Sequence, residues 1–487
     1  MFWTAICKWD SNSHVSLDKM RSMIFLRILC LGCFFLGMSV IRAQDTIPFR
    51  AGEVVERVFL KGKTDESFAL YLPNSYDPQM PMPALFVFDP AARGFVGVET
   101  FKKAAETLGW IVIGSNDSRN GPYERSFGQA NRLFQDALSR FNLDQDHIYV
   151  AGFSGGARLA TTLAVLSDQI RGVIACGAAF SPNPGQIPPP GANFSYAGIV
   201  GNRDMNYQEM RKARDWLAKI ELPHRLFFFN GGHQWPSEAH IQRALNWMSF
   251  QTGASSSSLR PDIYRNYFEM ERSFADSLYR KGQYFESAGE YQKLIDQFGS
   301  GFPMDSIWAR LSQIRAMGDF RKQKKRDEAL VEKEAILRKR FSDRFRSEVE
   351  QASPPEKFTW WQREKDKLDA KYVASEMEGE KNLAARMYNF LFTMAFEASN
   401  QWRRQDQYNK SRYCAYLLTV VFPENSYAQV RLAEEYALID KPDEVIASLK
   451  RAEELGYSDL SGVRDNPLFR PYINREDFPF HPGKKER

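Results

Sequence analysis

Short apolar runs alternate with amphipathic segments along the first half of the chain, between residues 54 and 251. Apolar runs bounded by turn residues are typical of buried strands, and apolar residues at helical spacing indicate helices that pack on a sheet. The expected strands are residues 54–60, 68–72, 84–88, 110–114, 148–151, 173–176, 197–200 and 226–229. The expected helices are residues 98–108, 124–141, 156–166, 206–220 and 237–250. This alternation predicts an α/β fold, with a mainly parallel sheet covered by helices on both faces.

The pattern changes after residue 251, where strand signals almost vanish and apolar residues recur at helical spacing to about residue 456. Residues 252–262, TGASSSSLRPD, are polar and rich in Gly and Ser, which is typical of a linker. A chain of 487 residues is also too long for one ordinary core. We therefore expect an α/β domain over residues 50–251, a linker over 252–262 and an all-α domain over 263–480.

Part of the helical half resembles the tetratricopeptide repeat. In residues 431–457, RLAEEYALIDKPDEVIASLKRAEELGY, apolar and small residues stand at the family's positions on two consecutive helices. A looser copy lies at residues 273–298, whereas residues 301–381 fit the pattern poorly. The resemblance implies a tetratricopeptide-like helical array that could bind a protein partner. An irregular helix bundle is the alternative.

The N-terminus has the pattern of an export signal. Basic residues precede an uncharged apolar run at residues 28–41, which is short for a membrane span. We expect residues 1–43 to be a signal peptide cleaved after Ala43, with Met20 as an alternative start. A lipoprotein anchor at Cys33 is disfavoured, because the apolar run continues past that cysteine. The expected location is the periplasm or the medium, with no stable membrane span after cleavage.

Composition excludes several classes of function. The 65 basic and 60 acidic residues are nearly balanced and interspersed, so nothing indicates a nucleic-acid partner. Three of the five cysteines lie in the leader, so no disulfide framework is implied. No HExxH motif, paired CxxC, Walker motif or dinucleotide-binding glycine motif is present, and we expect neither a metal nor a cofactor.

The sequence GFSGG at residues 152–156 joins an expected buried strand to an expected helix. Small flanking glycines permit the sharp, strained reversal that lifts a serine hydroxyl clear of a sheet. In this context the motif resembles the nucleophile elbow of the α/β-hydrolase fold, with Ser154 as the nucleophile. A glycine-rich turn that happens to contain a serine is the alternative.

A serine hydroxyl needs a base to remove its proton, and the base needs an acid that holds its tautomer. The resemblance implies that both follow the serine, in the order Ser, Asp, His. Asp204 follows the expected strand 197–200, and His233 follows the expected strand 226–229. Asp215, on the helix after Asp204, is the alternative acid.

The tetrahedral intermediate of such a reaction needs hydrogen-bond donors for its oxyanion. The resemblance implies one donor at the backbone N–H of Gly155 and a second in the loop after the third strand. Many relatives carry His-Gly in that loop, whereas this chain carries Asp89-Pro90. Proline has no N–H, so Ala91 is the candidate second donor.

Two further loops are expected at the same edge of the sheet. The polar run 116–121, NDSRNG, follows the fourth expected strand, and Arg119 and Asn120 could contact a polar acyl or sugar group. A self-capped turn explains the same residues equally well. Residues 180–191, FSPNPGQIPPPG, contain too many prolines for a helical lid, which favours an open, shallow site.

The resemblance is to compact esterases of the dienelactone hydrolase, feruloyl esterase and carboxylesterase type. It implies a serine hydrolase that cleaves small or polysaccharide-linked carboxylic esters through an acyl-enzyme, and the predicted signal peptide implies that this hydrolase is exported. One alternative is a serine peptidase of the same fold. The other is a catalytically degenerate hydrolase domain in a periplasmic protein-binding scaffold, which the unusual Asp89-Pro90 loop would favour.

Overall fold

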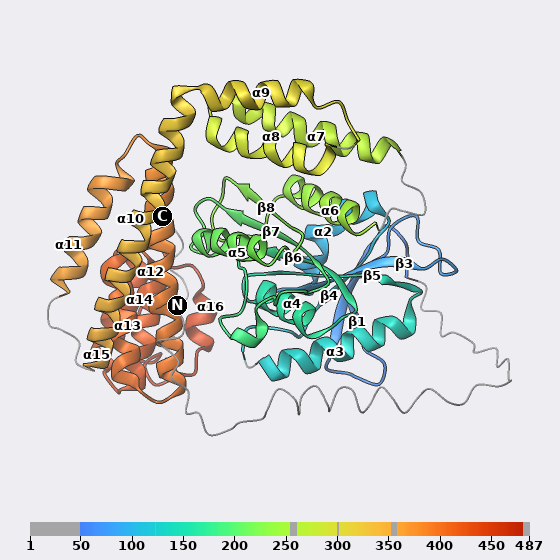
Figure 1. The fold of residues 1–487 in the computed structure, drawn as a ribbon. Coiled ribbons are helices and arrows are strands. Elements are labelled where there is room, and N and C mark those ends of the chain that lie inside the picture. Colours follow the sequence, from blue (N-terminus) through green and yellow to red (C-terminus); the bar gives the residue numbers. More distant parts are fainter. Residues whose placement is uncertain (1–48, 122, 254–260, 300, 352–357, 481–487) are drawn as a thin grey trace.

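The computed structural model describes residues 49–480, apart from residues 122, 254–260, 300 and 352–357. The predicted signal peptide, with Met20 and Cys33, lies outside the described residues. Most of the predicted linker also lies outside them. The described chain forms a sheet covered by helices, followed by a long series of further helices (Figure 1).

The sheet has eight strands in the order β1-β2-β4-β3-β5-β6-β7-β8. β2 is antiparallel to both β1 and β4, and all the other neighbouring pairs are parallel. The strands are β1 Val54–Phe59, β2 Ser67–Tyr71, β3 Met82–Phe88, β4 Ile111–Ser115, β5 Leu143–Phe153, β6 Ile170–Cys176, β7 Ser195–Gly201 and β8 His224–Phe229. This is the sheet of an α/β-hydrolase fold, so the predicted fold class is confirmed.

Helices cover both faces of the sheet because the inner strands are apolar on both sides (Figure 1). The helices of this part are α2 Gly94–Leu108, α3 Tyr123–Arg140, α4 Gly155–Leu166, α5 Tyr207–Lys219 and α6 Glu238–Thr252. α2 and α6 bury their apolar faces in one cluster with the sheet, and α3, α4 and α5 contribute to the cluster on the other face. Residues 180–191 contain only a 3₁₀ turn, η1 (Pro184–Gln186), and no longer helix.

The second half is helical wherever it is regular. Its helices are α7 Pro261–Arg280, α8 Tyr284–Phe298, α9 Asp305–Ala316, α10 Gly318–Glu350, α11 Thr359–Leu368, the π-helical turn η3 Asp369–Val373, α12 Glu378–Arg404, α13 Tyr408–Val421, α14 Ser426–Leu438, α15 Pro442–Glu454 and α16 Leu460–Asp465. The 33-residue helix α10 runs from α9 to the group formed by α11 to α16 (Figure 1). The tetratricopeptide character of this region stays a prediction.

The first helices of this series share a core with the sheet. Tyr267 of α7 and Phe298 of α8 belong to the same buried cluster as Trp247 of α6. Beside this cluster, the buried guanidinium of Arg243 on α6 donates to the buried carboxylate of Glu271 on α7 at 2.6 Å. Buried charges are tolerated only when they are paired, so these contacts attach α7 firmly to the α/β part.

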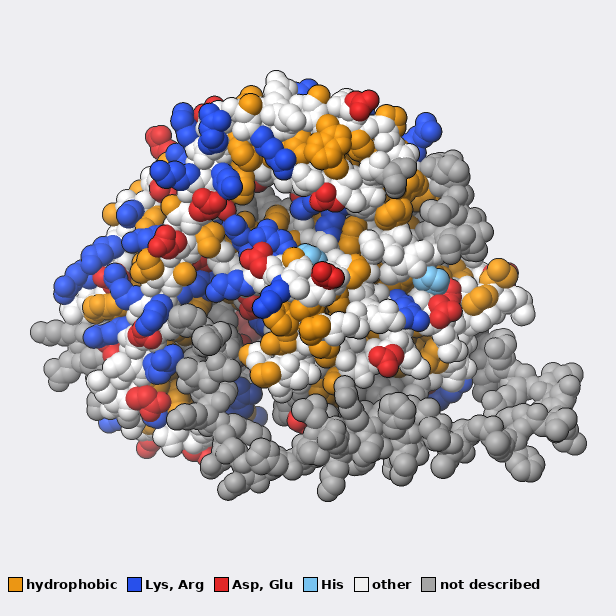
Figure 2. Space-filling model, viewed as in Figure 1, with side chains coloured by type: hydrophobic (Ala, Val, Ile, Leu, Met, Phe, Trp, Pro, Cys, Tyr) orange, Lys and Arg blue, Asp and Glu red, His pale blue; other side chains and the backbone are white. Residues whose placement is uncertain are grey.

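The surface agrees with the even charge balance of the sequence. Over the helical region, basic and acidic side chains are interspersed on the face that Figure 2 shows. None of the described helices combines the length and the hydropathy that a bilayer crossing requires.

Candidate active site

Ser154 occupies a strained turn between β5 and α4. Its φ of 52° and ψ of −117° lie in a region that L-residues rarely adopt. The flanking glycines are required by close backbone approaches: a Cβ on Gly152 would lie 2.2 Å from the carbonyl oxygen of Gly156, and one on Gly156 would lie 2.0 Å from that of Phe88. The sequence thus forms a sharp elbow that presents the serine at the carboxyl end of β5.

His233 connects Ser154 to Asp204 through two hydrogen bonds. Nε2 of His233 lies 2.9 Å from Oγ of Ser154, and Nδ1 lies 2.8 Å from Oδ2 of Asp204. With the proton on Nδ1, the imidazole donates to the carboxylate and accepts from the serine hydroxyl. The three residues come from the loops after β5, β8 and β7 and meet at the carboxyl edge of the sheet.

The carboxylate of Asp204 is fully buried and its two oxygens have separate partners. Oδ2 accepts from His233, and Oδ1 accepts the backbone N–H of Asn206 at 2.8 Å. The side chain of Asn206 donates to the carbonyl oxygen of Gly177 at 2.8 Å, which anchors the loop to the end of β6. Asp215, the alternative acid, lies on α5 and pairs with the neighbouring Arg214 at the surface.

The two expected oxyanion donors differ in their surroundings. Gly155 is the first residue of α4, and an N–H at this position has no partner within its helix. The N–H of Ala91 instead donates to Oδ1 of the buried Asp89 at 2.8 Å. It would have to leave that carboxylate before it could bind an oxyanion. Aspartate side chains often accept a hydrogen bond from the backbone N–H two residues later and so form a local turn. Hydrophobic periodicity, which predicts strands and helices, does not show such a turn.

Arg119 and Asn120 lie beside the loop after β3. Arg119 forms an isolated antiparallel bridge with Ala91, and the N–H of Asn120 donates to the carbonyl oxygen of Pro90 at 2.9 Å. The side chain of Asn120 lies directly against Gly155, because a Cβ there would be 1.8 Å from its Oδ1. The structure therefore brings Asn120 next to the elbow, and both Arg119 and Asn120 are exposed.

Asp89, which the sequence placed in the expected oxyanion loop, and Trp235, for which it predicted no role, contact each other near the site. Oδ2 of Asp89 accepts from Nε1 of Trp235 at 3.0 Å, and the guanidinium of Arg93 donates to both carboxylate oxygens at 2.9 Å. Burial alone would raise the pKa of Asp89, but the hydrogen bonds from Arg93, Ala91 and Trp235 hold it below its ordinary value. In the sequence, residues 230–236 are NGGHQWP, so Trp235 lies two residues after His233. This proximity was the one sign that Trp235 belongs near the site.

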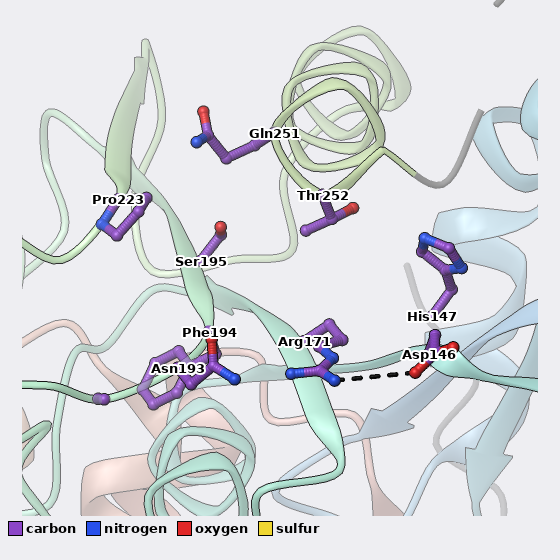
Figure 3. Close-up of a pocket in the computed structure, with 10 residues that line it drawn as sticks. Asp146, His147, Arg171, Asn193, Phe194, Ser195, Pro223, Gln251 and Thr252 are labelled. Carbon is purple, nitrogen blue, oxygen red and sulfur yellow. Dashed lines mark ion pairs between the residues drawn. The ribbon is translucent and has the colours of Figure 1, made fainter. Parts of the chain in front are cut away.

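A separate hollow of about 380 Å³ opens at the opposite edge of the sheet (Figure 3). It lies where β5 to β8 begin and α6 ends, and Arg171 and Asp146 pair across it at 3.8 Å. In open α/β sheets, ligands bind at the carboxyl ends of the strands, so this hollow is not the candidate active site. Among the described residues, no group of three His, Cys, Asp or Glu side chains could hold a metal ion.

No family model matches the chain, and no curated protein matches it. Solved structures that are similar include an S-formylglutathione hydrolase from Staphylococcus aureus, at 15% identity over 41% of this chain and 98% of that one, with a TM-score of 0.34. A truncated carbohydrate esterase from gut microbiota has 12% identity over 43% and 98%, with a TM-score of 0.36. The feruloyl esterase module from Clostridium thermocellum in complex with sinapinate has 15% identity over 41% and 88%, with a TM-score of 0.32. The fold assignment itself rests on the strand order and on the elbow.

Proposed function

We propose that this protein is a serine hydrolase that cleaves carboxylic esters through an acyl-enzyme on Ser154. The observation that supports the proposal is the hydrogen-bond chain from Ser154 through His233 to the buried Asp204, with links of 2.9 and 2.8 Å. A buried carboxylate that orients a histidine toward a serine hydroxyl is the arrangement that makes this weak nucleophile reactive.

In the proposed acylation step, Oγ of Ser154 bonds to the ester carbonyl carbon while its proton moves to Nε2 of His233. Asp204 stabilises the resulting imidazolium. The N–H of Gly155 donates to the oxyanion of the tetrahedral intermediate. When that intermediate collapses, the bond to the alkoxy oxygen breaks, and His233 returns the proton to the leaving alcohol.

Deacylation repeats the sequence with water. His233 removes a proton from a water molecule, whose oxygen bonds to the acyl carbon. The bond to Oγ then breaks, Ser154 recovers its proton and the carboxylic acid departs. Neither step requires a metal or an organic cofactor.

The ester class is proposed from the resemblance to compact esterases and from the lack of a helical lid in residues 180–191. The proline-rich segment 180–191 contributes only a 3₁₀ turn, as an open, shallow site requires. Small or polysaccharide-linked esters fit such a site. A serine peptidase of the same fold is the nearest alternative, and peptide amides test it.

The decisive experiment is labelling with a fluorophosphonate probe of the wild type, Ser154→Ala and His233→Ala. We expect labelling of the wild type only, together with hydrolysis of activated esters in preference to peptide amides. A wild type that resists the probe and turns over no activated ester would favour the second candidate function, a protein-binding scaffold. The observation that favours the scaffold is the hydrogen bond of 2.8 Å from the N–H of Ala91 to Asp89, because this N–H is then not free to bind an oxyanion.

We also propose that residues 1–43 direct export to the periplasm or medium and that residues 263–480 bind a protein partner. Sequencing of the mature N-terminus tests the first proposal, and a chain that begins at Gln44 is the expected result. Retention of residues 1–43 in a cytoplasmic product would contradict it. Crosslinking in the host tests the proposal of a protein partner. It compares the full chain with a variant in which exposed side chains of α14 and α15 are replaced.

A further inference from the structure

The loop that carries Asp204 is covered by helices far along the chain. In residues 202–205, every backbone carbonyl group except that of Asp204 accepts a hydrogen bond from a side chain of α10 or α12. Nη1 of Arg386 donates to the oxygen of Asn202 at 2.6 Å, and Nδ2 of Asn389 donates to that of Arg203 at 3.0 Å. The oxygen of Met205 accepts from Nη2 of Arg338 at 2.7 Å; these three bonds bracket Asp204.

The backbone N–H groups of the same loop are held from the other side. The N–H of Asn202 donates to the carbonyl oxygen of Phe229 at 2.8 Å, and the N–H of Arg203 donates to that of Gly231 at 2.9 Å. Residues 202–206, between β7 and α5, form the acid loop, and residues 230–237, between β8 and α6, form the histidine loop. Gly231 lies two residues before His233, so these bonds connect the acid loop to the histidine loop. The acid loop is therefore held from two sides. Its N–H groups donate to the end of β8 and to the histidine loop, and its carbonyl groups accept from the C-terminal helices.

Glu334 of α10 holds the two arginines in place. Its fully buried carboxylate accepts from Nε of Arg386 at 2.8 Å and from Nε of Arg338 at 3.0 Å. It also accepts from Nε2 of Gln208, at the start of α5, at 3.0 Å. Burial alone would raise the pKa of Glu334, but the charges of Arg386 and Arg338 hold it below its ordinary value. Each guanidinium thus bridges one buried carboxylate and one carbonyl of the acid loop.

This arrangement differs from an incidental surface contact. Arg386 is only 5% exposed, and its guanidinium also lies 4.8 Å from the ring centre of Tyr207. A buried arginine that lost either Glu334 or its carbonyl partner would leave an unpaired polar group, which is costly. In the observed arrangement the loop and the helices satisfy one another's polar groups, and in the same arrangement Asp204 reaches His233.

We propose that Glu334, Arg386 and Arg338 are positioning residues that hold Asp204 against His233, which makes the C-terminal helices a structural part of the catalytic unit. This inference rests on the proposed function of Ser154. It predicts that changes in α10 and α12, far along the chain from the triad, lower turnover. The mechanism is loss of alignment, because small displacements at a reacting centre reduce rate steeply.

The test uses the full chain and the variants Glu334→Gln and Arg386→Met. We expect kcat with an activated ester to fall roughly tenfold to a hundredfold, as for a misplaced catalytic group, while KM changes less than about twofold because the substrate surface is intact. Asn389→Ala, a partly exposed position that does not threaten folding, should lower kcat in the same direction by less.

Glu435→Gln is the matched control. Glu435 of α14 is also a fully buried glutamate, and it accepts from Nε of Arg403 at 3.0 Å and from Oγ of Ser399 at 3.1 Å, both on α12. It makes none of the bonds to the acid loop. We expect this variant to lose thermal stability as Glu334→Gln does while its kcat stays within about twofold of the wild type, because no group at the reacting centre moves.

Amide hydrogen exchange of a peptide covering residues 202–208 gives a readout that needs no catalysis. Exchange should become faster in Glu334→Gln and Arg386→Met and stay unchanged in Glu435→Gln. If Glu334→Gln and Arg386→Met left both the exchange and kcat unaltered, the inference would be overturned. The proposed function would still stand if the wild type were labelled and active. Suppose instead that exchange is faster in Glu334→Gln and Arg386→Met, but that the fluorophosphonate probe does not label even the wild type. That result would support the role of these residues in holding the loop and would overturn only the proposed function.

Discussion

The indole Nε1 of Trp235 donates a hydrogen bond to Oδ2 of Asp89 at 3.0 Å and so joins the loop of His233 to the loop after β3. The ring of Trp235 also packs against Phe153, at 5.3 Å between ring centres, and Phe153 packs against the imidazole of His233 at 4.6 Å. The buried carboxylate is thus connected to the candidate base through two aromatic side chains, Trp235 and Phe153.

Trp235→Phe should keep the ring packing and remove this hydrogen bond. We expect the free energy of unfolding to fall by about 1–3 kcal/mol, because a buried charged acceptor loses a donor, and the rate of fluorophosphonate labelling to fall with it. Urea denaturation and labelling kinetics measure the two effects. Trp216→Phe is the control, since Nε1 of Trp216 donates to the neutral carbonyl of Pro188 at 3.0 Å. Equal labelling rates in the wild type and Trp235→Phe would contradict the link.

Asp204→Asn should abolish most of the activity while it leaves the fold intact. An asparagine amide donates where the carboxylate accepts, and it favours the wrong histidine tautomer; in a serine protease the same change lowers kcat about 10⁴-fold. Steady-state hydrolysis of an activated ester measures the loss. The matched control is Asp215→Asn, on the exposed face of α5, where the side chain of Asp215 is 67% exposed. If Asp215→Asn lost as much activity as Asp204→Asn, the acid would be assigned wrongly.

Gly155→Ala should disturb the elbow through Asn120. The added Cβ would lie 1.8 Å from Oδ1 of Asn120, so one of the two residues must move. We expect slow labelling of Ser154 in the single variant and partial recovery of stability in the double variant Gly155→Ala/Asn120→Ala. Thermal unfolding of both variants and of Asn120→Ala completes a double-mutant cycle. Strictly additive effects would show that Asn120 and Gly155 do not interact.

Stability should decrease on mild acidification because of His240. Burial and the nearby charge of Arg243 lower the pKa of His240 from 6.5 to about 4, against the opposing charges of Glu271 and Glu290. Between pH 6.5 and about 4, the unfolded chain therefore binds more protons at this residue than the folded protein. The free energy of unfolding should fall as the pH decreases through this window.

His240→Gln removes this titration. We expect a smaller fall in the free energy of unfolding between neutral pH and the lower end of the window than in the wild type, measured by urea denaturation at each pH. His240 lies in the first turn of α6 and is not part of the hydrogen-bond chain of Ser154, His233 and Asp204, so the effect should appear in stability and not in ester turnover at neutral pH. Identical pH slopes for the two proteins would contradict the prediction.

Local sequence determined the sheet, the helices and the elbow. All eight expected strands overlap observed ones, because a buried strand needs a short apolar run wherever it lies. The expected strand 148–151 is longer in the structure, where β5 begins at Leu143 and includes polar residues before its buried segment. The glycines around Ser154 were also readable, since close backbone approach leaves no room for a Cβ.

Tertiary structure decided which polar groups meet. Hydrophobic periodicity could place Asp204 and His233 after their strands, but it could not show that Nδ1 of His233 lies 2.8 Å from Oδ2 of Asp204, nor that residues more than a hundred positions away hydrogen-bond to the loop of Asp204. Ala91 is a local case: its N–H donates to Asp89, two residues before it, in a turn that hydrophobic periodicity does not show. A periodic pattern shows only which side chains are buried, whereas the polar groups of Ser154, Asp204 and His233 meet because segments that are distant in the chain are adjacent in the fold.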